Sequence, residues 1–195
     1  MQTVRRQAAI LQAELRNFTR MSEMLDPEKV LALASEFFSL AGEIVREHSG
    51  KVLSVYNDTL LAAFPGGTPA EFSGYALKAA QHLQRDFGSL GLRWQSEYGL
   101  PAAVSVGIHL GETVFGMAGP AGAQQFVAFG DPVSIAERLV HRARNGEIVL
   151  SLPVMKALGA AAAELGTEQL PPIELSKRPP IPIYGILLED RLDFT

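Results

Sequence analysis

The stretch that decides the fold is AILQAELRNFTRMSE, residues 9–23. Its first half is mostly apolar and ends in the carboxylate of Glu14, a pattern typical of a central buried strand. A turn at Asn17 and a helix start follow. Because a helix N-terminus leaves N–H groups unpaired, the backbone of Phe18 and Thr19 is placed to bind a phosphate group.

A second stretch, KVLSVYNDTLLAAF at residues 51–64, predicts a β-hairpin. Its strands, 52–56 and 60–64, flank Asn57-Asp58, and asparagine tolerates the positive φ of a tight turn. Asp58 is then expected at a strand end beside that of Glu14. Two adjacent carboxylates next to a helix start favour a site for two divalent cations and a polyphosphate.

The order of predicted elements gives an α+β fold. We expect a ferredoxin-like β-α-β-β-α-β sheet with helices on one face, plus extra C-terminal strands. The predicted helices are 28–48, 71–90, 131–143 and 154–158. Beyond the first strand (7–15) and hairpin, the predicted strands are 102–110 and 113–117 (a second hairpin around Gly111), 124–129, 148–151 and edge strands within 174–188.

Composition narrows the function classes. A chain of 195 residues that is 47% hydrophobic can bury one core, so residues 1–195 are expected to form a single domain. The net charge of −4 argues against nucleic-acid binding, and the lack of cysteine excludes disulfides and cysteine-bound zinc. The four histidines lack metal-ligand spacing and are interpreted as ordinary helix-end and strand residues. No apolar run reaches the length of a membrane span or signal peptide, so we expect no membrane insertion and a cytoplasmic location.

Five motifs resemble the class III nucleotidyl cyclase (adenylate/guanylate cyclase) catalytic domain, over about residues 8–188. ILQAELRNFT resembles the family's metal-binding strand, with glutamate in place of aspartate and asparagine in place of glycine. EHSGKVLSVYNDTLLAAF resembles its second-metal hairpin, and YALKAAQHLQ its second helix. VSVGIHLGETVFGMAG is the most specific match, and FVAFGDPVSIAERL resembles the segment that ends in the family's catalytic helix.

The resemblance implies a head-to-tail dimer with composite sites at its interface. Glu14 and Asp58 of one subunit would hold two Mg²⁺ or Mn²⁺ ions, and ATP or GTP would be the substrate. The partner subunit would read the base and stabilise the transition state. A homodimer is the expected assembly, with a heterodimer with a competent cyclase as the alternative.

The residues expected on the partner side depart from the family pattern. Ser54 stands where an adenylate cyclase has its base-reading lysine, and Gln125 stands near the position of the base-reading aspartate. Ser134 replaces the asparagine that orients the ribose. Arg138 matches the arginine that stabilises the transition state and is retained.

Three interpretations follow. The first is a catalytically degenerate cyclase domain that acts as a dimerisation or regulatory module and retains residual binding of metal and nucleotide. The second is an active but divergent cyclase with relaxed base choice. The third is a binding domain with an apolar cleft, although the residues that would line it are interpreted mainly as core and interface: Phe115, Met117, Phe126 and Phe129.

Overall fold

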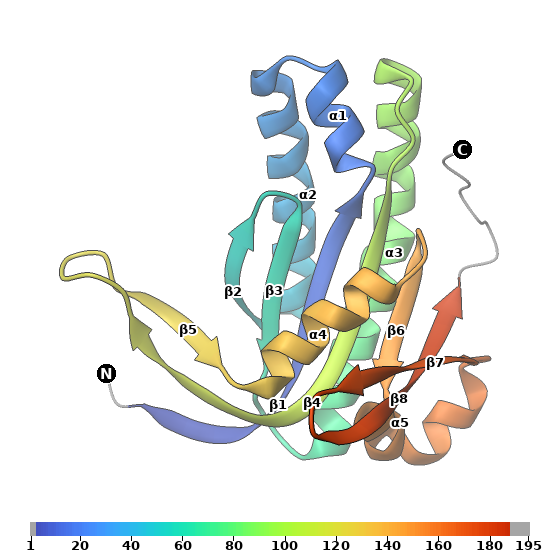
Figure 1. Cartoon of the computed structure of the whole chain (residues 1–195). Helices are drawn as coiled ribbons and strands as arrows, with labels where there is room; N and C mark the ends of the chain where they lie inside the picture. The colour runs from blue at the N-terminus through green and yellow to red at the C-terminus, as the bar shows by residue number, and fades with distance from the viewer. Residues whose placement is uncertain (1–2, 188–195) are drawn as a thin grey trace.

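The computed structural model describes residues 3–187, and these form one eight-stranded mixed sheet with helices packed on it (Figure 1). Its strand order is β2-β3-β1-β4-β6-β8-β7, and β5 pairs with β4 outside this path. The strands are β1 (Val4–Arg16), β2 (Lys51–Tyr56), β3 (Thr59–Phe64), β4 (Ala103–Ala118), β5 (Gln125–Phe129), β6 (Glu147–Ser151), β7 (Glu168–Leu175) and β8 (Arg178–Leu187). The helices are α1 (Phe18–Met24), α2 (Pro27–Glu47), α3 (Pro69–Tyr98), α4 (Asp131–Arg142), α5 (Leu152–Leu158) and a 3₁₀ segment, η1 (Gly159–Glu164).

The central strand β1 separates two cores. Its odd-numbered residues from Ala9 to Leu15 are buried in the large core with residues of α2 and α3. Ala8 and Ile10 point to the opposite face and pack in a smaller cluster with Ala136 of α4. Since successive side chains of a strand alternate between faces, one apolar run supplies both cores.

The expected α+β fold class is confirmed, but the helices lie on both faces of the sheet instead of one. The helices were expected on one face, and α2 and α3 do share one, but α4 lies on the other (Figure 1). The backbone of α4 rests on β4 at Gly107. A Cβ atom there would lie 2.5 Å from the Val140 nitrogen and 2.6 Å from the Ala136 oxygen, so only glycine permits this approach.

The predicted hairpin around Gly111 is wrong, because β4 runs unbroken through it. Gly111 lies opposite Ala8 in the β1–β4 ladder. A Cβ atom at Gly111 would come within 2.6 Å of Cγ of Pro132, the second residue of α4. This glycine therefore marks a close helix contact and not a turn.

Several other predicted boundaries shift outward. Strand β1 begins at Val4 instead of residue 7, and α3 continues to Tyr98 instead of ending at residue 90. The extension of α3 follows from Trp94, which is fully buried in the large core. The prediction of edge strands within 174–188 is right only in part: β8 fills most of that range but lies between β6 and β7, and the edge strand is β7, which starts earlier, at Glu168. Leu188 of that prediction lies outside the described residues.

The first predicted hairpin is confirmed. Strands β2 and β3 are joined by Asn57-Asp58, and Asn57 has a φ of 51°. Within residues 3–187, no helix combines the length and apolar character needed to cross a bilayer.

Gly107→Ala tests the contact between α4 and β4. We expect the added methyl group to lower the free energy of unfolding by about 1–3 kcal/mol, because the atoms it meets are backbone atoms that cannot move aside alone. Urea denaturation measures the change. The control is Gly88→Ala in α3, where the methyl group meets nothing within 4 Å and should raise stability by up to about 1 kcal/mol. Equal effects of the two variants would contradict the close contact.

Candidate functional site

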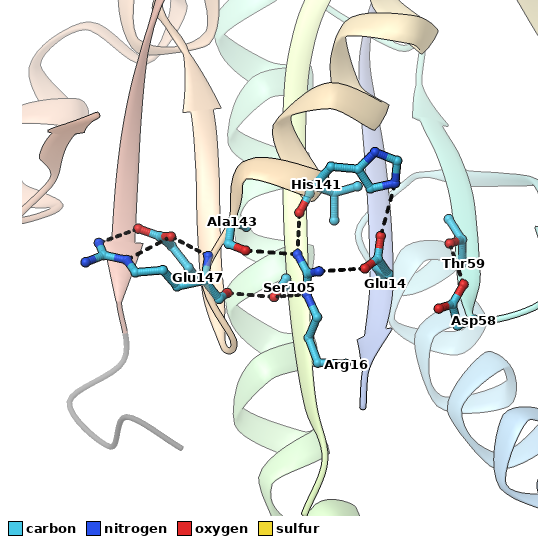
Figure 2. Close-up of polar contacts among 10 residues, drawn as sticks. Glu14, Arg16, Asp58, Thr59, Ser105, His141, Ala143 and Glu147 are labelled. Atoms are coloured by element: carbon cyan, nitrogen blue, oxygen red, sulfur yellow. Dashed lines mark hydrogen bonds and ion pairs between the residues drawn. The ribbon is translucent and has the colours of Figure 1, made fainter. Parts of the chain in front are cut away.

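The structure brings Glu14 and Asp58 to the same end of the sheet. Glu14 is opposite Thr59 in the β1–β3 ladder, and the Leu15 N–H donates to the Asp58 carbonyl at 2.8 Å. Figure 2 shows Glu14 on β1 and Asp58 in the turn that leads into the neighbouring strand β3. Asp58 is half-buried, and its Oδ1 accepts a hydrogen bond from the Thr59 hydroxyl at 3.1 Å. The two predicted acidic residues are therefore neighbours, as the sequence indicated.

Both carboxylate oxygens of Glu14 have partners within the chain. Arg16 Nη1 donates to Oε1 at 2.7 Å, and His141 Nε2 lies 3.4 Å from Oε2. The side chain of Glu14 is only 13% exposed and that of Arg16 17%. Glu14 is thus part of a largely buried ion pair and not a free acid at the surface.

Arg16 joins Glu14 to the C-terminal end of α4. Its Nε donates to the Ser105 hydroxyl at 2.8 Å, and its Nη2 donates to the carbonyls of Val140 and Ala143, the latter at 3.0 Å (Figure 2). The last carbonyls of a helix have no partner inside it and carry partial negative charge, so a guanidinium is a favourable partner for them. The side chain of Arg16 therefore connects β1, which carries Glu14, to α4, which carries Arg138.

The pKa of Glu14 reflects these surroundings. Burial raises the pKa of its carboxyl above the usual value, and the Asp58 charge adds to that rise. Arg16 and His141 oppose the rise by favouring the ionised form. The contribution of Asp58 follows from its position at the strand end next to Glu14.

The contacts continue from Arg16 into the neighbouring strands. The Ser105 hydroxyl donates to the Arg144 carbonyl at 2.7 Å. The Arg144 side chain in turn binds both carboxylate oxygens of Glu147, which is fully buried, with Nη2 to Oε1 at 2.6 Å and Nε to Oε2 at 3.1 Å. Every member of this chain of contacts has a partner, which is the condition for a buried polar network to stabilise a fold.

Sequence reasoning missed Arg16 and interpreted His141 as an ordinary helix-end residue. A signal for Arg16 was present: it is two residues after Glu14 on one strand, so both side chains project from the same face. The contact of His141 depends on how α4 crosses the sheet, which local sequence does not reveal. His141 remains 57% exposed and contacts Glu14 from the end of its helix.

The turn after β1 keeps its shape without glycine. Asn17 adopts the left-handed conformation with a φ of 70°, and its Nδ2 donates to the Pro101 carbonyl at 2.7 Å. Phe18 is half-buried against the large core, and Thr19 is exposed in the first turn of α1. Asparagine thus replaces glycine here because it tolerates positive φ and gains a hydrogen bond.

The residues expected on the partner side are all at the surface. Ser54 is on β2 next to a bulge, Gln125 begins β5, and Ser134 lies in α4, and each is exposed. Strands β2 and β5 approach each other, since the Lys51 ammonium lies 3.7 Å from the centroid of the Phe126 ring. Arg138 is also exposed, and its Nη2 donates to the Glu174 carbonyl of β7 at 2.6 Å.

The predicted apolar cleft residues divide into two groups. Phe115 is buried in the smaller core cluster, and Phe126 packs against it. Met117 is 38% exposed and Phe129 63%. The interpretation as core is therefore right for Phe115, and the other side chains are accessible to different degrees.

Comparison with known proteins identifies the family. The model of the "Adenylate and Guanylate cyclase catalytic domain" family matches residues 2–186. The chain belongs to this family. Adenylate cyclase 1 of Rhizobium meliloti (strain 1021) is 31% identical to this cyclase domain over 140 residues, which are 69% of the chain and 20% of that protein. An adenylate cyclase of Anabaena cylindrica is 28% identical over 138 residues and 27% of its length, so the chain spans about a fifth to a quarter of these relatives.

Solved cyclase structures share the fold of this domain. The adenylyl cyclase CyaB from P. aeruginosa superposes with a TM-score of 0.88 at 19% identity, over 98% of each chain. The guanylyl cyclase Cya2 gives a TM-score of 0.82 at 24% identity, over 97% of this chain and 96% of that one. At these identities the likeness establishes the fold, and the chemistry of this cyclase domain has to be argued from its own residues.

Glu14 and Asp58 of this cyclase domain supply carboxylate oxygens, which are the type of ligand that a divalent cation such as Mg²⁺ binds. Mg²⁺ prefers oxygen ligands and is commonly held by one or two carboxylates, with water and substrate phosphates completing its shell. Glu14 and Asp58 would be those carboxylates. Among the described residues, no three or more His, Asp or Glu side chains are arranged around a common metal position. A cation at Glu14 would also compete with Arg16 and His141 for the same oxygens.

Arg16→Met tests the ion pair. The folded-state pKa of Glu14 is raised, so this carboxyl favours folding below its unfolded pKa and opposes folding as pH rises through the folded pKa. Removing Arg16 should raise that pKa further, because its cation favours the ionised form. We expect a loss of about 3 kcal/mol at pH 7 and a smaller loss near pH 4, which is below the raised pKa of Glu14.

Guanidinium denaturation at the two pH values measures the difference for Arg16→Met. The double variant Glu14→Gln/Arg16→Met should recover part of the loss at pH 7, since it leaves no unpaired carboxylate. Arg20→Met, at an exposed position of α1, is the control. A loss that is the same at both pH values would show that the charge of Glu14 is not what Arg16 balances.

Proposed function

We propose that this chain is a catalytically degenerate class III cyclase domain that acts as a dimerisation and regulatory module. It would form a head-to-tail homodimer as a single domain of residues 1–195 and retain weak binding of a metal–nucleotide complex through Glu14 and Asp58. The observation that carries the proposal is the Glu14–Arg16 ion pair, in which a cation of the chain already contacts the first carboxylate at 2.7 Å.

The metal side of the site is altered in geometry as well as in charge. A glutamate is one methylene longer than the aspartate of the family pattern, which moves its carboxylate by about 1.5 Å. Catalytic groups generally have to be held within about 0.5 Å of their working positions. With one oxygen on Arg16 and the other facing His141, Glu14 is held in a place set by the fold's own contacts.

The nucleotide side has lost the groups that would read a base and orient a ribose. The hydroxyl of Ser54 is shorter than a lysine side chain and carries no charge, and the amide of Gln125 offers both donors and an acceptor. Ser134 is likewise shorter than asparagine. Loss of a single electrostatic stabiliser typically lowers kcat by about 10²–10³-fold, so several such losses leave little turnover.

A second candidate is an active, divergent nucleotidyl cyclase that makes cyclic AMP or cyclic GMP. It is favoured by the preserved pairing of Glu14 with Asp58 and by the retained Arg138. When bound there, two divalent cations would activate the ribose 3′-hydroxyl and neutralise the polyphosphate. In a heterodimer, the acidic pair would serve a partner that supplies the base-reading residues.

The deciding experiment measures cyclic nucleotide formed by the purified protein at high concentration, with Mn²⁺ and either ATP or GTP. We expect little or no product from a folded dimer confirmed in the same sample. The variant Glu14→Asp/Ser54→Lys/Gln125→Asp/Ser134→Asn restores the family residues and should raise ATP turnover by at least about 10²-fold. Rapid turnover by the unmodified protein would overturn the proposal in favour of the divergent cyclase.

Asp58→Ala separates the two candidates further. If the unmodified protein makes product by the two-metal route, this variant should abolish it, and Glu164→Ala, a change at an exposed acid of η1, should not. For the degenerate domain, Asp58→Ala should instead weaken Mn²⁺-dependent binding of a fluorescent ATP analogue and leave the dimer intact. Unchanged binding would remove Asp58 from the site.

A further inference from the structure

A small cavity of about 250 Å³ lies at the end of the sheet opposite to Glu14 and Asp58. It opens on the face that carries α4, where Ala63 and Phe115 belong to the smaller core cluster. Most of its wall is apolar, and its two charged residues are both cationic. The lining residues are Val4, Arg6, Lys51, Leu53, Ala63, Pro65, Phe115 and Phe126.

The cavity is separate from the acidic pair. Arg6 and Glu14 are eight residues apart on β1, and a strand rises about 3.3 Å per residue, so about 26 Å of strand lies between them. On β2, the cavity is lined by Lys51 and Leu53, and Ser54 is not among its wall residues. A ligand here would touch neither carboxylate of the candidate metal site.

Aromatic rings form one wall and position a cation beside it. The rings of Phe115 and Phe126 are stacked, with centroids 6.1 Å apart and planes 10° apart. The Lys51 ammonium lies 3.7 Å from the Phe126 centroid, which holds it at the cavity by a cation–π contact. Packing against a ring leaves the ammonium's other N–H bonds free to face an anion.

The second cation, Arg6, projects from β1 on the same face. Its neighbour Arg5 points to the other face and pairs with Glu112 at 3.0 Å. Within residues 3–187, neither Arg6 nor Lys51 makes an ion pair with a carboxylate. Two cations therefore border an apolar cavity without a counter-charge from the described part of the chain.

We propose that this cavity binds a small organic carboxylate with an apolar body, about the size of benzoate. The aromatic and aliphatic walls would take the body, and Arg6 and Lys51 would bind the carboxylate by charge-assisted hydrogen bonds. The volume lies just below the range of about 300–1,000 Å³ usual for drug-sized ligands, which limits the body to a single ring or a short branched chain. A nucleoside triphosphate is too large and too polar for these walls. The cavity borders the surface expected to face the partner subunit, since Leu53 and Phe126 adjoin Ser54 and Gln125 in sequence, and its ligand is proposed in addition to the role of that surface in the dimer.

Benzoate is the probe. Its binding to the full chain is measured by ligand-observed NMR and by calorimetry, beside acetate, which has the charge without the body, and benzyl alcohol, which has the body without the charge. We expect benzoate to bind at least about tenfold more tightly than either, because only benzoate uses both the cations and the aromatic wall. Equal affinity for acetate or for benzyl alcohol would overturn the proposal.

Variants locate the site. Lys51→Met and Arg6→Met should each weaken benzoate binding by about tenfold or more, and Lys29→Met, an exposed position in α2, should leave it unchanged. Ala63→Leu should exclude benzoate by filling the cavity, and far-ultraviolet circular dichroism and melting confirm that each variant is folded. Asp58→Ala should not alter benzoate binding. Displacement of benzoate by Mn²⁺–ATP, or a loss caused by Asp58→Ala, would place the anion in the nucleotide site and contradict the inference.

Discussion

The pairing of β1 with β4 is the interaction on which the rest of the structure depends. All thirteen residues of β1 pair with β4, from Val4 opposite Phe115 to Arg16 opposite Ala103. The two strands are covered on one face by α2 and α3 and on the other by α4. One end of the ladder carries Glu14 and Arg16, and the other end carries the wall of the cavity. The length of this ladder is what keeps the two features apart.

Arg16 is the second feature on which the structure depends, because its side chain connects the end of β1 to β4 and to the C-terminal end of α4. Without it, β1 would meet α4 mainly through the apolar contacts of Ala8 and Ile10 with Ala136. With it, a carboxylate of β1, a hydroxyl of β4 and two carbonyls at the end of α4 share one guanidinium. A planar side chain with five N–H donors suits such a meeting of acceptors, which a lysine could not reproduce.

Features set by local chemistry could be predicted from the sequence, and features set by distant contacts could not. The Asn57-Asp58 turn was predictable because a positive φ is a property of the residue itself. Gly111 was misread because a glycine in a turn and a glycine beneath a helix look the same in sequence, and Pro132 decides between them. The pairing of Glu14 with Asp58 followed from the order of strands. The partners of Glu14 depend on the crossing of α4 over the sheet, which no short motif encodes.

The presence of Arg16 changes the sum of formal charges at this end of the sheet. Glu14 and Asp58 would contribute −2 on their own, and with Arg16 beside them the three side chains sum to −1. One divalent cation would therefore change the charge of this group of three side chains from −1 to +1. The same cation beside the two carboxylates alone would bring their charge from −2 to zero. A second divalent cation would approach a group that already repels it, and only the negative charge of a bound polyphosphate could reverse that repulsion. Occupancy by two cations would thus be coupled by electrostatics to the presence of a nucleotide.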